Sequence, residues 1–233
     1  FYMIEVNPRA SRTIPFLSKC LGHSLAKLAS KVLIGNSLRD LGFSSEIVPT
    51  SYAVKAPVFP FNKFLKVDPI LGPEMKSTGE VMGRGSTFGE AFGKAIKAAG
   101  DEIPTRGNIF VSVKDSDKKY LPELCQKFIE LGFNIKATKG SCKFLADKGI
   151  RVEKVNKVLE GRPHIVDEIL NNEICMVINT TEGRQSIKDS FSIRRSALEH
   201  STFLTTTISG GFAIAESLEK PSNEWNYIPL QTS

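Results

Sequence analysis

The sequence predicts an α/β protein whose second half is a doubly wound parallel sheet. From residue 107 onward, short apolar runs alternate with helical patterns, as they do in sheets built from strand–helix–strand units. Three of these runs end in a small polar residue, namely Phe133–Ala137 before Thr138, Val152–Val155 before Asn156, and Cys175–Ile178 before Asn179. Strands of an open α/β sheet present such side chains at their carboxyl edge, where ligands bind.

Cationic residues near these strand ends indicate an anionic ligand. Lys139, Lys157 and Arg184 lie beside hydroxyl residues and predicted helix starts, which is the environment of a phosphate site. Gly140 would let the backbone approach a ligand. Thr138 and Ser141 could contact that ligand or could merely cap the following helix.

Composition narrows the possible functions. The 233 residues are 41% hydrophobic and 24% charged, with a formal charge of +6, enough for one large or two modest globular domains. Lys and Glu are interspersed, which favours a small phosphorylated ligand over nucleic acid. No apolar run reaches the length of a membrane span, and there is no charged leader, so we expect a cytoplasmic protein without a membrane partner. The four cysteines lie in apolar patterns without C-x-x-C spacing and are expected to be reduced thiols.

The chain opens on an apolar strand pattern, Phe1–Asn7, and is interpreted as a fragment of a larger domain. Glu5 and Asn7 would share one face of that strand. They could hold a divalent cation, or they could be solvated polar residues at a strand end.

Other elements of the first half follow from glycine and proline punctuation. We expect helices that end near glycines at Pro15–Leu21, Ser24–Ile34, Ser37–Gly42 and Thr87–Ala99. Tyr52–Phe61 and Ser77–Gly83 are expected to be extended. The glycine-rich stretch Gly83–Gly89 is interpreted as a turn before a helix, because its third glycine comes one residue late for a dinucleotide loop.

The polar stretch Asp101–Gly107 is the predicted domain boundary. The expected strands after it are Asn108–Val113, Phe133–Ala137, Arg151–Val155, Cys175–Ile178 and Phe203–Ile208. The expected helices are Lys119–Leu131, Ser141–Asp147, His164–Asn171, Ile187–His200 and Gly211–Leu218. We expect the tail from Lys220 to pack irregularly. There is no pattern typical of a catalytic triad or a zinc site, and His164 is expected to begin a helix rather than act as a base.

Several blocks closely resemble the large subunit of carbamoyl phosphate synthetase: I-E-V-N-P-R-A-S-R-T (4–13), L-G-P-E-M-K-S-T-G-E-V-M-G (71–83), E-G-R-P-H-I (160–165), V-I-N-T-T-E-G-R (177–184) and S-I-R-R-S-A (192–197). The resemblance covers nearly the whole chain. It implies that residues 1–103 are the C-terminal part of the second ATP-grasp half, and that residues 107–233 are a Rossmann-like regulatory domain of the methylglyoxal-synthase-like fold.

The resemblance also implies a function. The full-length protein would be an ATP-dependent carbon–nitrogen ligase that uses Mg²⁺ or Mn²⁺ and ATP, serves pyrimidine and arginine biosynthesis, and has a glutamine amidotransferase small subunit as partner. The present chain would be its nucleotide-effector domain and would be catalytically inactive alone. An oligomer formed through the regulatory domain is expected.

Site residues are carried over from the family position by position. Glu5 and Asn7 match metal ligands, and Arg9 matches a nucleotide-phosphate contact. Residues that match the UMP- and IMP-binding positions are Lys118, Thr138, Ser141, Lys157, Asn179, Thr181 and Ser190. At the family's ornithine site only Thr206 is kept, because Ala56 and Leu204 replace an acidic and an aromatic residue. The resemblance therefore favours UMP inhibition over ornithine activation.

Two alternatives remain open at this stage. One is a methylglyoxal-synthase-like lyase acting on dihydroxyacetone phosphate, which would need carboxylate and imidazole groups at the strand ends. The corresponding loop offers Gly161-Arg162-Pro163 instead. The other is an interaction module whose helical faces form an oligomer contact.

Overall fold

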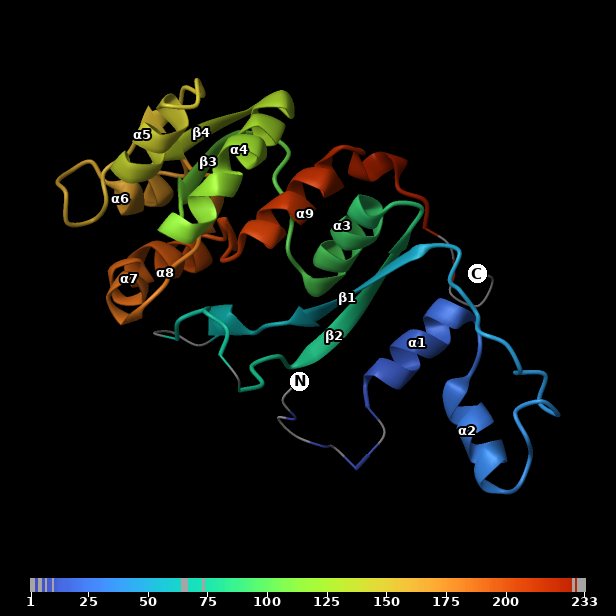
Figure 1. Ribbon diagram of the computed structural model, residues 1–233. Helices are drawn as coiled ribbons and strands as arrows, with labels where there is room; N and C mark the ends of the chain where they lie inside the picture. The colour runs from blue at the N-terminus through green and yellow to red at the C-terminus, as the bar shows by residue number, and fades with distance from the viewer. Residues whose placement is uncertain are drawn as a thin grey trace.

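Two sheets form the framework of the computed structural model (Figure 1), which describes residues 3, 6, 8, 9, 11–63, 67–72, 74–227 and 229. β1 (Tyr52–Val58) and β2 (Gly79–Gly85) pair antiparallel. The second sheet has five parallel strands in the order β5-β4-β3-β6-β7. Its strands are β3 (Gly107–Ser112), β4 (Phe133–Ala137), β5 (Glu153–Lys154), β6 (Met176–Asn179) and β7 (Phe203–Thr205). The predicted parallel α/β sheet is therefore confirmed.

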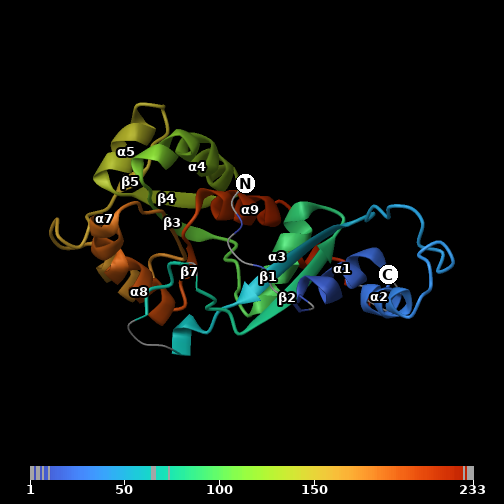
Figure 2. The same cartoon turned by 60° about the horizontal axis from the view of Figure 1, so that its bottom comes forward.

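Helices cover both faces of the five-stranded sheet, because successive residues of a strand point to opposite faces. Ile109 and Val111 of β3 pack with α4 (Leu121–Glu130) and α9 (Ile208–Leu218). Phe110, between them, packs into a second core with α6 (Ile165–Leu170) and α8 (Phe191–Glu199). Figure 2 shows the sheet between α4 on one side and α8 on the other. The sheet is doubly wound, as the alternating pattern predicts.

The first half contains α1 (Thr13–Leu21), α2 (Leu25–Leu33), the two-stranded sheet and α3 (Phe88–Ala99), with the short 3-10 helix η1 (Phe61–Lys63) after β1. α3 packs on β1 and β2 and extensively against α9. The two halves are therefore joined by a helix–helix contact across the predicted boundary, as Figure 1 shows.

The glycine-rich stretch before α3 serves close packing. A Cβ atom at Gly83 would collide with the Ala91 carbonyl oxygen, and one at Gly85 would lie 2.7 Å from the Ala91 nitrogen. A Cβ at Gly89 would collide with the Glu216 carbonyl oxygen of α9. Thr87 caps α3 by accepting a hydrogen bond from the Glu90 nitrogen at 3.2 Å. The interpretation as a turn before a helix is therefore confirmed only for Ser86 and Thr87, because Gly83–Gly85 are the end of β2.

Two helix predictions are wrong. Ser37–Gly42 forms turns instead of a helix. The Ser37 hydroxyl accepts from the Asp40 nitrogen at 3.1 Å and the Leu41 nitrogen donates to the Ser37 carbonyl at 3.2 Å, but Gly42 adopts the left-handed conformation and ends this single turn. The helix expected at Ile187–His200 is split into α7 (Arg184–Asp189) and α8, with Ser190 ending the first and starting the second.

Smaller shifts concern element ends. α9 begins three residues earlier than expected, because Thr207 caps it by accepting from the Gly210 nitrogen at 3.0 Å. The strands predicted at Ser77–Gly83, Arg151–Val155 and Phe203–Ile208 are shifted or shortened to the bounds of β2, β5 and β7. Most of the strand expected at Phe1–Asn7 lies outside the described residues.

The tail packs on the first half. After η3 (Ser222–Glu224), the Trp225 ring lies where a Cβ at Gly93 of α3 would stand, and its indole nitrogen donates to the Lys220 carbonyl at 3.2 Å. All four cysteines are free thiols, with Cys20 and Cys125 buried and Cys142 and Cys175 half-buried. In the part of the chain that the structure describes, no helix is both long and apolar enough to span a bilayer.

Candidate functional site

The order of the strands reverses between β3 and β6. From β3 the chain first adds β4 and β5 on one side and then crosses to add β6 and β7 on the other. At such a reversal the connections leave in opposite directions, and ligands bind beyond the carboxyl ends of the two strands. Here those ends are paired through Ser112 and Asn179. The segments after β3, β4, β5 and β6 lie at this edge of the sheet. We call them the nucleotide rim, after the ligand that the sequence predicts there.

Lys118 lies beside the start of the helix that follows β4. The 3-10 helix η2 (Asp115–Tyr120) follows β3 and carries Lys118, whose Nζ lies 2.6 Å from Asp115 Oδ1. The same Nζ lies 3.5 Å from the position that a Cβ of Gly140 would occupy. The hydrogen bond and charge of Lys118 lower the pKa of Asp115, and the charge of Lys157 adds to this. Lys118 and the start of α5 (Lys139–Ala146) are thus neighbours, and Lys157 is near enough for its charge to act on Asp115.

The N-terminus of α5 is open to an anion. Its N-cap residue, Thr138, makes no side-chain cap hydrogen bond, and the first turn has no acidic residue. Ser141 lies inside the first turn rather than at the cap, so the alternative that these two hydroxyls serve as caps is wrong. Both residues are buried, with exposed fractions of 5% and 1%, while Lys139 and Gly140 are exposed. Uncapped N–H groups at a helix start attract negative charge.

At the end of β6, hydrogen bonds fix the orientation of the Asn179 side-chain amide. Asn179, only 1% exposed, donates from Nδ2 to the Ser112 carbonyl at 3.2 Å and accepts at Oδ1 from Arg194 Nη1 at 3.0 Å. Thr180 accepts at Oγ1 from the Lys114 nitrogen at 3.1 Å. These bonds orient the start of the β6–α7 loop. Thr181 in that loop is half-buried, and Ser190 is buried at the junction of α7 and α8.

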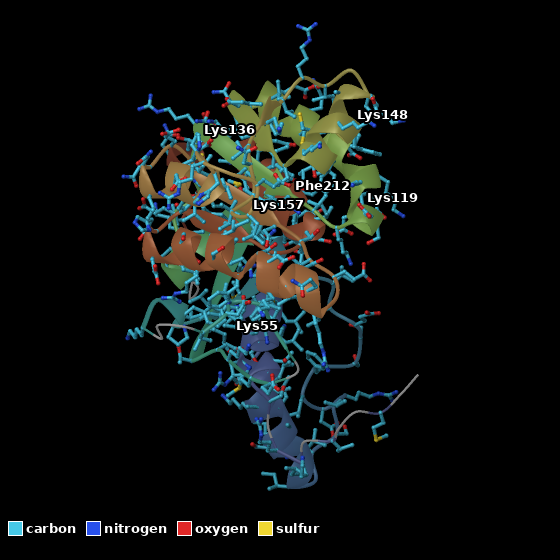
Figure 3. All side chains as sticks on the ribbon, turned by 90° about the vertical axis from the view of Figure 1, so that its left-hand side faces the viewer. Lys55, Lys119, Lys136, Lys148, Lys157 and Phe212 are labelled. Carbon is cyan, nitrogen blue, oxygen red and sulfur yellow. The ribbon has the colours of Figure 1, made fainter. Side chains whose placement is uncertain are left out.

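The remaining predicted site residues lie elsewhere. Thr206 follows β7, which lies one strand away from the reversal between β3 and β6, and it is half-buried. Leu204 packs against the core that contains α6 and α8, and Ala56 is buried in β1 opposite Val81. Arg9 is exposed. Figure 3 shows Lys157 on the part with the five-stranded sheet and Lys55, from β1, on the other part.

The predicted metal ligands Glu5 and Asn7 lie outside the described residues. Within the described part of the chain, no group of three or more His, Cys, Asp or Glu side chains is arranged to hold a metal ion.

His164 caps a helix, as predicted. Its Nδ1 accepts from the Asp167 nitrogen at 3.3 Å, and the Asp167 carboxylate accepts from the His164 nitrogen at 3.0 Å, which forms a capping box at the start of α6. The side chain is 8% exposed. A ring that is buried and used in a cap is poorly placed to act as a proton-transfer base.

Sequence reasoning missed Arg194, which has no exposed surface. Its Nε donates to Asp68 Oδ1 at 2.8 Å, and its Nη2 donates to Asp68 Oδ2 at 2.5 Å and to the Ile187 carbonyl at 2.8 Å. The one local signal was an arginine next to Ile193 on the buried face of a helix pattern. Its partner Asp68 is 126 residues away in the sequence, beyond the reach of any periodicity.

The chain is similar to known proteins. A family model described as an MGS-like domain matches residues 120–206. Carbamoyl phosphate synthase large chains from Pseudomonas syringae pv. tomato and Pseudomonas aeruginosa are 58% and 56% identical over 218 residues, which are 94% of this chain and 20% of each relative. The large chain from Pasteurella multocida is 52% identical over 219 residues, again 94% of this chain and 20% of the relative.

The chain spans about a fifth of the length of the curated relatives that it matches. It therefore carries an MGS-like domain within a segment that is homologous, over 94% of its length, to carbamoyl phosphate synthase large chains.

Proposed function

We propose that the chain is the effector-binding part of a carbamoyl phosphate synthase large subunit. Residues 107–233 would be the regulatory domain and would bind a nucleotide monophosphate such as UMP or IMP. Residues 1–103 would be the end of the second ATP-grasp half. The observation that carries the proposal is the position of Lys118 beside the uncapped start of α5, near the switch point of a doubly wound sheet, with the charge of Lys157 acting on the same 3-10 turn.

Each part of the ligand has a matching surface. The two ammonium groups and the first N–H groups of α5 would hold the phosphate, with the hydroxyls of Thr138 and Ser141 beside them. The ribose and base would then lie toward Asn179, Thr181 and Ser190, which offer amide and hydroxyl groups.

The wider enzyme would be an ATP-dependent carbon–nitrogen ligase with Mg²⁺ or Mn²⁺, working in the cytoplasm with a glutamine amidotransferase subunit. In it, Glu5 and Asn7 would bind the metal and Arg9 a nucleotide phosphate. The present chain alone would form no carbamoyl phosphate. Ornithine would act weakly, because Ala56 offers no carboxylate to an ammonium group, a bond worth about 1.5–3 kcal/mol.

Calorimetric titration of the chain with UMP and IMP tests the proposal. We expect Lys118→Ala and Lys157→Ala each to weaken binding roughly 10- to 150-fold, because each removes a charge-assisted bond to the phosphate. Lys119→Ala is the matched control, since Lys119 is exposed and lies over the Tyr120 ring, 4.9 Å from its centroid. Equal affinity in all four proteins would remove the phosphate from this rim.

The lyase alternative is disfavoured by the same geometry. The His164 side chain is used in its capping box, so it is not available as the base that would transfer a proton from a triose phosphate. We expect no release of phosphate from dihydroxyacetone phosphate by the purified chain, and release at a rate above the uncatalysed reaction would restore the lyase hypothesis.

A further inference from the structure

Arg194 joins four parts of the molecule through one buried side chain. It extends from α8, donates to Asn179 at the end of β6, donates to the Ile187 carbonyl of α7, and forms a bidentate ion pair with Asp68. Asp68 belongs to the segment between β1 and β2, outside the five-stranded sheet. Arg194 is therefore fixed at one end by the nucleotide rim and at the other by the first half of the chain.

The geometry makes this link stiff. A planar guanidinium that grips a carboxylate with two parallel bonds loses its angular freedom, which a lysine in its place would keep. Arg194 is completely buried, and the side chain of Asp68 is only 24% exposed. A buried charge that loses its partner is strongly unfavourable, so the guanidinium has to follow any displacement of Asp68.

What moves with Arg194 is part of the nucleotide rim. Its Nη1 fixes the oxygen of the Asn179 amide, which leaves Nδ2 directed at the Ser112 carbonyl. Its Nη2 holds the α7 carbonyl between Thr181 and Ser190. A shift of the guanidinium would therefore change the orientation of Asn179 and the position of the loop that follows it.

We propose that Arg194 is a positioning residue for the nucleotide rim, and that the Asp68–Arg194 pair couples occupancy of the rim to the segment between β1 and β2. The inference rests on the proposed nucleotide function. Coupling between two sites is reciprocal. A nucleotide that changes the Asn179 contacts must therefore change the environment of Asp68, and a change at Asp68 must change nucleotide affinity.

The test is calorimetric titration of the 233-residue chain with UMP and IMP. We expect Asp68→Asn to weaken binding about 3- to 10-fold, the loss of roughly one well-oriented hydrogen bond. The direction of the change in affinity is informative. If Asp68 had no effect on the position of other groups, removing its negative charge would leave phosphate binding unchanged or make it tighter. Glu74→Gln is the matched control, as an exposed carboxylate in the same segment.

A double-mutant cycle separates coupling from general loosening. If Asp68 acts through Arg194, then Asp68→Asn adds little to the effect of Arg194→Lys, whereas independent effects would add. Thermal unfolding shows whether each variant is folded. Should Asp68→Asn not fold, Asp68→Glu keeps the charge but displaces the carboxylate by one methylene, and the same weakening is expected.

Hydrogen exchange supplies a readout that a purely structural clamp would not change. Saturating nucleotide should slow exchange around Asp68 in the wild-type chain and not in the Asp68→Asn variant. If the wild-type chain binds no nucleotide, the proposed function fails and this inference with it. If it binds, and the folded Asp68 variant binds within twofold of it, only the coupling is refuted.

Discussion

At the scale of single residues, Asp115 would compete with the proposed phosphate for Lys118. Its carboxylate lies 2.6 Å from Lys118 Nζ, and its side chain is 93% exposed, so it occupies a cation that we assign to the phosphate without being locked in place. We expect Asp115→Asn to tighten UMP binding about two- to fivefold, as measured by calorimetry, because the phosphate no longer has to displace a carboxylate.

The matched control is Asp117→Asn, in the same 3-10 turn. Its carboxylate makes no ion pair among those found in the described part of the chain. A gain of equal size in both variants would mean a general charge effect on the rim, and no gain in either would show that Lys118 is not used by the ligand.

Residue-level prediction from the sequence succeeded where the signal was local. Polar residues directly after apolar runs were correctly expected at one sheet edge, because parallel strands share that edge. Arg194 could not be found in this way. Its burial depends on Asp68, which the fold brings to it from the other half of the chain.

At the scale of elements, the start of α5 can be tested by a substitution that separates binding from stability. Gly140 is exposed and helical, and a Cβ there would meet only Lys118 Nζ, at 3.5 Å. We expect Gly140→Ala to stabilise the fold by about 0.5–1 kcal/mol, because alanine loses less backbone entropy in a helix. The added methyl would stand where a phosphate approaches the helix, so nucleotide affinity should fall.

Urea unfolding and calorimetric titration measure these two effects separately. Gly79→Ala is the control, since a Cβ at Gly79 meets nothing within 4 Å and its position lies in β2, away from the rim. Unchanged affinity in a stabilised Gly140→Ala variant would mean that no ligand reaches the start of α5.

Glu90 makes the packing of α3 sensitive to acid. The Glu90 carboxylate is 3% exposed and contacts Lys94 at 2.7 Å, the Ser86 hydroxyl at 2.9 Å and the Asn226 nitrogen at 3.3 Å. Burial raises its pKa, but the hydrogen bonds from Lys94 and Ser86 and the Lys94 charge outweigh burial and lower the pKa from 4.5 to about 2.

A carboxyl group whose pKa is lower in the folded state stabilises the fold above its unfolded pKa and loses that effect as the pH falls. We therefore expect Glu90→Gln to be less stable than the wild-type chain by roughly 3 kcal/mol at pH 7, with the difference largely gone near pH 2. Urea unfolding between pH 2 and pH 7 measures this. The exposed Glu123→Gln variant should show no such convergence.

Helix and strand types were largely predictable because glycines mark helix ends. Gly22 and Gly100 adopt the left-handed conformation directly after α1 and α3, a conformation that other residues adopt at a cost. The break at Ser190 was not predictable from periodicity. The apolar pattern continues through it, and the helices are separated by where α8 docks on the sheet.

At the scale of the whole molecule, the chain is unevenly buried. The five-stranded sheet has two continuous cores. By contrast, α1 buries only Cys20, and α2 has no buried residue. Apolar side chains remain exposed around them, including Leu33 at 86%, Ile34 at 80% and Val48 at 74%. Exposed apolar side chains, where they gather on one surface, are typical of an interaction site.

Deletion of residues 1–48 should therefore change stability little and association strongly. We expect the melting temperature to fall by less than about 3 °C, because few buried contacts are lost. In analytical ultracentrifugation we expect the intact chain to self-associate with rising concentration and the shortened chain to sediment as a monomer. Loss of Cys20 is the main stability cost, so Cys20→Ala in the intact chain is the control for it.

The outcome also bears on the expected oligomer. Association that survives the deletion, and that changes with UMP, would have to use the regulatory domain, whereas association that vanishes would assign the contact to the surface around α2.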